Sequence, residues 1–264
     1  PNGATLLTGI KTNTPEYILL YGGPHADSGG DYKSEFSAGP SKTGISKANI
    51  YHTASQRTNN LELDPSKGMT VEFWMKKEGW ANDNTAVSES DGNYECVFDA
   101  WNSGSATLGA TAGSIYGRHS ISVHSSSPRE ICYLLHSGSA HATHVGLVGT
   151  DAPDAFALDS GHNIVDGHWH HYALTTKQEG TDIVVKLYTD GQLTDMKRTT
   201  VTINPITGAM VATLGAFATS NRYGVLFTAD HTPGAGKLSG SLDEFRFWKT
   251  ERTAQQIGRY YRDQ

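Results

Sequence analysis

Charge, cysteine and long apolar runs are all scarce in this sequence, and each scarcity excludes a class of protein. Charged residues make up 18% of 264 residues, below the roughly 25% of an average soluble domain. The 21 basic residues form no run and the formal net charge is -6, so we expect no nucleic-acid partner. No stretch approaches the ~18 apolar residues of a membrane span, and no basic-then-apolar leader follows Pro1.

Cysteine is limited to two residues, Cys96 and Cys132. Two cysteines are too few for the disulfide framework of a small secreted domain. Both lie in apolar segments, which favours buried thiols of low reactivity. The sequence leaves open whether the two sulfur atoms pair.

Glycine is abundant instead, with 29 residues, and short segments that alternate apolar and polar residues are separated by Gly, Asn, Asp and Ser. A period of two is typical of half-buried β-strands, and the pairs Asp166-Gly167 and Asp190-Gly191 are typical of turns. The pattern therefore predicts an all-β protein. The expected strands are 17–21, 60–63, 69–76, 95–98, 120–124, 131–136, 168–176, 183–188, 211–215, 225–228 and 242–248.

One helix is predicted, near the end of the chain. Thr253 and Gln256 have the T-x-x-Q spacing of a capping box. Ile257, Tyr260 and Tyr261 then fall on one side of the helix. A helix this short is marginal alone in water, so we expect it to pack on the β-structure.

The last predicted strand places an acidic residue among aromatic ones. With strict alternation, Asp243 shares one strand face with Phe245 and Phe247. A carboxylate on an apolar face needs a metal ion or several hydrogen-bond donors. We therefore expect Asp243 to be buried and structural.

Five segments carry a family pattern: TNNLEL at 58–63, GMTVEFWM at 68–75, DGHWHHYALT at 166–175, VKLYTDG at 185–191 and GSLDEFRFW at 240–248. In this order they resemble the laminin G-like domains, including the pentraxin-like branch, of the concanavalin A-like lectin/glucanase superfamily. The resemblance covers roughly residues 47–262. It implies a two-sheet antiparallel jelly-roll sandwich with a short C-terminal helix. We divide the chain into an N-terminal extension or added strand, 1–45, and a jelly-roll domain, 46–264.

The resembled superfamily includes glucanases, so glycoside hydrolysis is one candidate activity. Those enzymes carry E-x-D-x-E or E-x-D-x-x-E on a strand, which puts two carboxylates across a sugar ring. The nearest string here runs from Glu89 through Asp91 to Glu95 and is too long for either form. No nucleophile elbow, P-loop or dinucleotide fingerprint is present. We expect no enzymatic activity.

A metal site has two candidate positions. The resemblance implies a structural calcium ion at Asp243, whose oxygen ligand suits a hard cation; the alternative is that Asp243 only accepts backbone hydrogen bonds. The run from His168 to His171 puts His168 and His170 on one strand face, as a zinc pair requires. The same run matches a structural strand of the family, which favours histidines packed in a sheet.

A further histidine group, formed by His136, His141 and His144, lies in a segment rich in Gly, Ser and Ala. Such a segment can bind a metal ion loosely. Its composition favours a solvated loop.

Aromatic residues near predicted strand ends are the candidates for ligand contact. Trp80, Trp101 and Tyr116 lie in segments rich in Asn, Ser and Gly, and Asn82 is close to Trp80. Aromatic rings beside hydrogen-bonding groups are typical of glycan sites. The same composition also suits loops between subunits of an assembly, and both interpretations stay open.

These observations favour a non-catalytic binding or assembly module that presents loops from a rigid sandwich. We hypothesise a phage virion protein made in a host cytoplasm, as a capsid decoration, fibre or tail part, with other virion subunits and cell-surface glycans as partners. The alternative is an extracellular glycan-binding or adhesive module of a secreted bacterial protein. The apolar run 17–21 predicts a strand on an N-terminal arm that covers a sheet edge or a neighbouring subunit.

Overall fold

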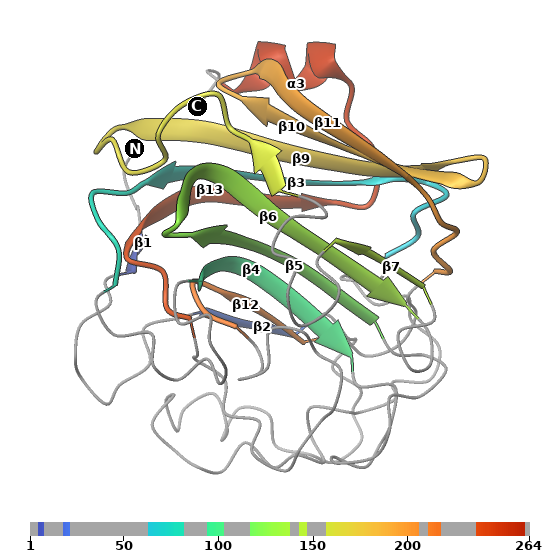
Figure 1. Ribbon diagram of the computed structural model, residues 1–264, viewed down its shortest axis with the longest axis horizontal. Coiled ribbons are helices and arrows are strands. Elements are labelled where there is room, and N and C mark those ends of the chain that lie inside the picture. The colour runs from blue at the N-terminus through green and yellow to red at the C-terminus, as the bar shows by residue number, and fades with distance from the viewer. Residues whose placement is uncertain are drawn as a thin grey trace.

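Two antiparallel sheets pack face to face in this computed structural model (Figure 1). The structure describes residues 5–7, 18–21, 63–81, 94–102, 117–137, 143–146, 157–205, 211–217 and 236–261. The first sheet has the order β1 (Thr5–Leu7), β13 (Gly240–Trp248), β3 (Met69–Lys76), β9 (Trp169–Glu179), β10 (Asp182–Thr189) and β11 (Gln192–Thr200). The second has the order β2 (Ile18–Tyr21), β12 (Val211–Leu214), β4 (Tyr94–Asn102), β5 (Gly117–His124), β6 (Ser127–Ser137) and β7 (Thr143–Gly146), and β8 (Ala157–Asp159) also pairs with β6. The predicted two-sheet antiparallel sandwich is confirmed.

The inner faces of the two sheets form one hydrophobic core. Val71, Phe73 and Met75 alternate along β3 and are 1% exposed or less. They belong to the same cluster as Phe98 on β4 and Ile121 on β5 of the opposite sheet. Because burying a side chain of this size contributes roughly 1.5–3 kcal/mol, contact between the two inner faces stabilises the sandwich.

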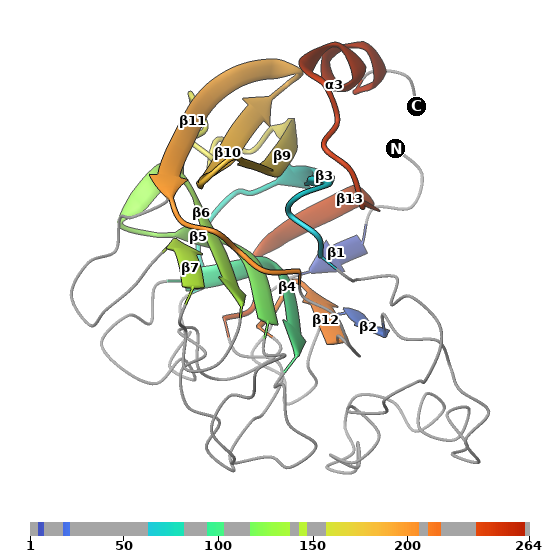
Figure 2. The same cartoon turned by 90° about the vertical axis from the view of Figure 1, so that its right-hand side faces the viewer.

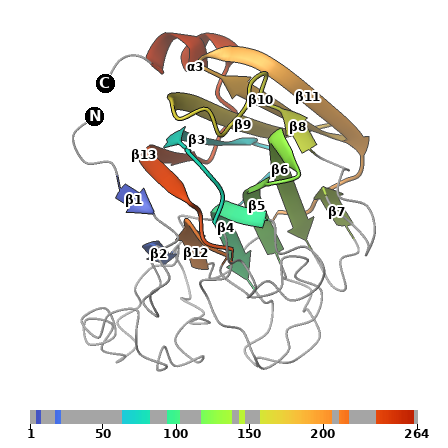
Figure 3. The ribbon, with the colours of Figure 1, turned by 60° about the vertical axis from the view of Figure 1, so that its left-hand side comes forward.

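One side of the sandwich is closed by β8. This strand pairs with β6 of the second sheet. Its Asp159 N–H also donates to Asp195 Oδ2 on β11 of the first sheet, at 3.0 Å. In Figure 3, β8 accordingly lies between β11 and β6.

Most predicted strands match observed ones. The bounds of β3 are those predicted, and β2, β4, β5, β6, β9, β10, β12 and β13 overlap predicted strands. Residues 60–62 and 225–228 lie outside the described residues. The sequence did not predict β1, β7, β8 or β11. The β11 strand lies at the sheet edge and is polar and mostly exposed, so it shows no apolar alternation.

The predicted helix is present as α3 (Ala254–Tyr260). The Thr253 hydroxyl accepts from the Gln256 N–H at 3.2 Å, and the Gln256 side-chain oxygen accepts from the Thr253 N–H at 2.9 Å. Ile257 is buried against Ala173 and Tyr188 on the outer face of the first sheet, so the helix packs on the β-structure as expected (Figure 3). With seven residues, α3 falls far short of a bilayer, and no other helix in the described ranges is a candidate span.

A β-bulge corrects the predicted face of Asp243. The pairing of β13 with β3 shifts between Asp243 and Arg246, and Glu244 adopts φ 50°. The extra residue reverses the alternation. Phe245 and Phe247 pack against the core, whereas Asp243 pairs with Trp74 on the outer face and is half-buried. Strict alternation was therefore the wrong assumption for this strand.

The N-terminal segment contributes an edge strand to each sheet. β1 pairs with β13, and β2 pairs with β12 (Figure 2). The strand predicted at 17–21 is thus confirmed as β2 and pairs within its own chain. Its contact with a neighbouring subunit stays a prediction.

The two cysteines are buried and are not disulfide-bonded. Cys96 and Cys132 pack with Tyr94 and Phe217 in a small second cluster. Burial raises the pKa of the Cys96 thiol well above its ordinary value. The interpretation of these residues as buried thiols is confirmed.

Candidate functional site

A buried ion pair fixes the base of the loop that carries Trp80. Lys77 Nζ donates to Glu95 Oε2, and both side chains are fully buried. The same ammonium group lies 4.3 Å from the centroid of the Trp80 ring. Trp80 is half-buried and packs against the core. The charge over one face of the indole holds the ring in place.

Glu95 joins three separate segments of the chain. Its Oε1 accepts from the Ala81 N–H at 2.6 Å, and its Oε2 accepts from the Ser239 N–H at 2.8 Å as well as from Lys77. The loop after β3, strand β4 and the segment before β13 therefore meet at one carboxylate. Burial lowers the pKa of Lys77, while the charge of Glu95 opposes that effect.

Glu95 is also the last residue of the acidic string that resembles a glycosidase motif. Glu89 and Asp91 lie outside the described residues. Glu95 is 1% exposed and already accepts three hydrogen bonds. A general acid or base must reach the proton of a substrate. The Glu95 carboxylate instead holds the base of the loop through these three hydrogen bonds.

The other predicted ligand residues are placed only in part. Trp101 lies in β4, where its backbone pairs with Arg118 and Val211; for Trp101 the structure describes the backbone alone. Asn82 and Tyr116 lie outside the described residues. Trp80 is thus the one predicted ligand residue with a described side chain.

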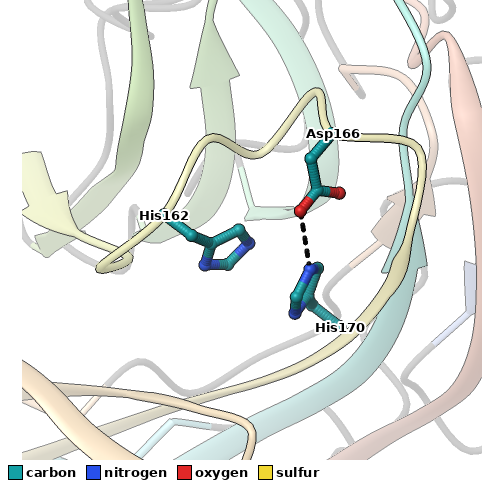
Figure 4. Close-up of side chains that lie close together, drawn as sticks. All are labelled: His162, Asp166 and His170. Atoms are coloured by element: carbon teal, nitrogen blue, oxygen red, sulfur yellow. Dashed lines mark hydrogen bonds and ion pairs between the residues drawn. The ribbon is translucent and has the colours of Figure 1, made fainter.

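A cluster of histidine and aspartate side chains is formed by the loop between β8 and β9 and by the first residues of β9 (Figure 4). His162, Asp166 and His170 each offer one ligand atom, and these atoms lie within 4.8 Å of one another. The two imidazole centroids are 3.9 Å apart, with the rings tilted by 34°. We call these three residues the His–Asp cluster.

His170 is held between two carboxylates. Its Nδ1 lies 2.7 Å from Asp190 Oδ2 and its Nε2 lies 3.0 Å from Asp166 Oδ2. Burial lowers the pKa of His170, but the hydrogen bonds to Asp190 and Asp166 outweigh burial and leave it raised. Asp190 is itself fixed, because its Oδ1 accepts from the His171 N–H at 2.9 Å.

His162 has a different environment. Its Nδ1 lies 3.1 Å from the Ser160 carbonyl oxygen, and its Nε2 lies 2.8 Å from the Tyr172 hydroxyl. Burial and the neighbouring charge of His170 lower the pKa of His162. The two adjacent rings therefore favour one charged and one neutral imidazole.

The His–Asp cluster and the Trp80 loop base are neighbours. The Gly167 N–H donates to the Lys77 carbonyl oxygen at 3.0 Å. Gly167 has φ 79°, which suits a residue without Cβ, and Asp166 Oδ1 accepts from the His168 N–H at 2.8 Å to complete the turn. This turn brings the loop before β9 against the end of β3.

Comparison with known families identifies the fold. The sequence model of the concanavalin A-like lectin/glucanases superfamily, in its laminin G form, matches residues 119–258. That match spans more than half of the chain. The chain belongs to this superfamily. The resemblance drawn from the five sequence segments is confirmed.

The solved structures that resemble this superfamily member are distant from it. A heptameric pentraxin from Limulus polyphemus is 14% identical with a TM-score of 0.40, covering 75% of this chain and 71% of that chain. The binding domain of botulinum neurotoxin DC, in complex with SialylT, is 11% identical with a TM-score of 0.40, covering 75% and 35%. Domains LG4-5 of the mouse laminin alpha1 chain are 10% identical with a TM-score of 0.40, covering 74% and 40%. The chain thus spans about a third of the neurotoxin structure's length, and no curated protein matches it.

The calcium ion that the family resemblance implies at Asp243 stays a prediction. Asp243 is half-buried, and its Oδ1 accepts from the N–H of Glu244 at 2.9 Å. Glu244 in turn accepts from Arg246 Nη2 at 2.5 Å. The alternative, in which Asp243 accepts a backbone hydrogen bond, describes the contact that is present.

Sequence reasoning found one member of the His–Asp cluster and missed two. It paired His170 with His168, whose side chain is 77% exposed. The other two members of the cluster instead come from the loop before β9, because the turn at Gly167 folds Asp166 back over the strand. The Asp-Gly pair directly before the histidine run was the available signal.

Proposed function

We propose that this superfamily member is a non-catalytic binding module whose ligands are glycans, and that the loop carrying Trp80 takes part in the contact. The observation that carries the proposal is the buried Lys77–Glu95 pair. This ion pair fixes the base of the loop, and its ammonium group lies against the large, half-buried ring of Trp80. A ring held in one position binds at a lower entropic cost than a mobile one.

The same pair supports the absence of catalysis. A glycosidase needs one carboxyl group to donate a proton and a second to act as nucleophile or base. Glu95 is buried under three donors. Its place in the fold is that of a positioning group.

The binding proposal is tested on a glycan array with the full chain. We expect the Trp80→Ala variant to lose at least tenfold in affinity for any glycan that binds. Trp248→Ala is the matched control, because it removes a ring of equal size that lies away from the Trp80 loop, on β13, and is 38% exposed. Equal losses in both variants, or no binding to any glycan, would overturn the proposal.

Hydrolysis is tested in parallel with β-glucans, agarose and chitin. No reducing ends should appear. Turnover that disappears in a Glu89→Gln variant would contradict the non-catalytic assignment, because Glu89 is the remaining glutamate of the acidic string.

The finer proposal is that the module works as a virion subunit. It is supported by the sparse cysteine and charge and by the strand-forming N-terminal segment. A virion subunit co-purifies with a particle at fixed stoichiometry. Recovery as a free adhesive module from the outside of bacterial cells would favour the alternative instead.

A further inference from the structure

We propose that His162, Asp166 and His170 bind a divalent transition-metal ion of the zinc type. The proposal goes beyond glycan binding and rests on the His–Asp cluster alone. This site also differs from the calcium site predicted at Asp243, because Asp243 lies on β13 and offers only oxygen ligands.

The donor set selects the class of ion. Two imidazoles and one carboxylate form a nitrogen-rich set that zinc and its neighbours accept, whereas calcium takes oxygen ligands. The three ligand atoms already lie within 4.8 Å of one another, and His170 Nε2 and Asp166 Oδ2 are 3.0 Å apart. In Figure 4 the imidazole of His162 faces the other two side chains. Bonds of about 2.0–2.2 Å from a zinc ion to each ligand atom require only that the three side chains move closer together.

The second argument comes from the atoms behind the ligands. Metal-bound histidines almost always donate their other N–H to a carboxylate or a backbone carbonyl. His170 Nδ1 has Asp190 Oδ2 at 2.7 Å, and His162 Nδ1 has the Ser160 carbonyl oxygen at 3.1 Å. Both rings are thus held through Nδ1, and Nε2 becomes the ligand atom once it exchanges its present hydrogen bond for the ion.

Two existing hydrogen bonds give way when the ion binds. Asp166 Oδ2 exchanges its contact with His170 for a bond to the metal, and any proton on His170 Nε2 leaves to solvent. His162 Nε2 gives up the hydrogen bond it shares with the Tyr172 hydroxyl. The Asp166 side chain is 30% exposed and the His170 side chain 19%, so water reaches the site and fills the remaining coordination positions.

The test is a titration of the full, chelator-treated chain with Zn²⁺ by calorimetry, and with Co²⁺ by its visible absorption. We expect one ion per chain. His162→Gln, Asp166→Asn and His170→Gln should each weaken binding at least tenfold. Asp190→Asn should weaken it about 10–100-fold, as is typical for a partner behind a ligand. Tyr172→Phe should tighten it by removing a competitor for His162 Nε2.

Two controls separate this site from other histidines. His168→Gln removes a neighbouring, exposed imidazole and should leave the affinity unchanged. A combined His136→Gln, His141→Gln and His144→Gln variant should also bind like the parent chain. Circular dichroism in chelator checks that each variant folds, and histidine NMR shifts of the parent chain with and without Zn²⁺ report the ligands directly.

Three results would overturn the proposal. The first is no Zn²⁺ binding by the parent chain. The second is unchanged affinity in Asp166→Asn and His162→Gln. The third is loss of binding in the control variants with shifts confined to histidines other than His162 and His170.

Discussion

Two regions of this molecule bring charged side chains together, and they differ in how much water reaches them. On β4 and β5, Asp99 accepts from Arg118 Nε at 2.8 Å and from Nη2 at 2.9 Å, and both side chains are fully buried. At the His–Asp cluster the contact between Asp166 and His170 is of similar length, 3.0 Å, but both side chains are partly exposed. The difference separates polar groups that stabilise the fold from polar groups that can change partner.

The contrast has a simple physical cause. A buried charge that loses its partner has no water to replace it. A partly exposed one exchanges a side-chain partner for water or an ion at little cost. We therefore expect substitution to destabilise the protein strongly in the buried region and only weakly at the partly exposed one, and three experiments measure this.

The largest expected effect is at the interior pair. Arg118→Met removes the guanidinium at similar volume and leaves the Asp99 carboxylate buried beside an apolar group. The free energy of unfolding should fall by about 3–5 kcal/mol, measured by urea denaturation. Arg129→Met is the control: it breaks an ion pair with Asp159 whose side chains are more than half exposed, and should cost no more than about 1 kcal/mol.

A second variant guards this prediction against simple misfolding. Adding Asp99→Leu to Arg118→Met removes the buried carboxylate that lost its guanidinium, so stability should recover in part. A double variant as unstable as Arg118→Met alone would show that packing, not charge, causes the loss.

The next effect concerns a core histidine. His119 lies between Phe98 and Tyr133, and in the described part of the chain neither ring nitrogen has a hydrogen-bond partner. Burial lowers the pKa of His119 from 6.5 to about 3. Between these values only the unfolded chain takes up the proton, so stability is complete above pH 6.5 and is lost as the pH falls toward 3.

The free energy of unfolding should fall by about 2 kcal/mol between pH 6.5 and pH 5, at roughly 1.4 kcal/mol per pH unit. Urea unfolding of the parent chain and of His119→Leu across this range isolates the contribution. His168→Gln serves as the exposed control and should keep the parent slope. An identical slope in His119→Leu would mean that other groups set the acid sensitivity.

The smallest loss of stability is expected at the His–Asp cluster. Asp166→Asn keeps an oxygen that accepts from the His168 N–H and weakens only the partly exposed contact with His170. In metal-free buffer the melting curve should report a loss below about 1 kcal/mol. A loss comparable to that of Arg118→Met would place the His–Asp cluster with the interior pair and remove the contrast.

Sequence alone predicted the features that depend on near neighbours. Alternation gave the bounds of β3, and the spacing of Thr253 and Gln256 gave the N-terminus of α3. The bulge at Glu244 was missed because no residue there favours a positive φ.

The interior pairs and the cluster escaped prediction for another reason. Arginine is almost never fully buried unless paired, and nothing near Arg118 in sequence identifies its partner on β4. The contact of Asp166 with His170 likewise depends on a loop that folds back through one turn. Both depend on three-dimensional contacts that periodicity does not encode.

The outer strand β11 has a consequence for how copies of this protein can associate. It ends the first sheet and carries Asp195, Lys197 and Arg198 along its length. Arg198 is paired with Glu179 and Asp182, and Asp195 with the backbone of β8. A second chain that added its own strand here would have to strip water from these charges, which protects the sheet against edge-to-edge aggregation. Copies of the protein are therefore expected to associate through surfaces other than this edge of the sheet.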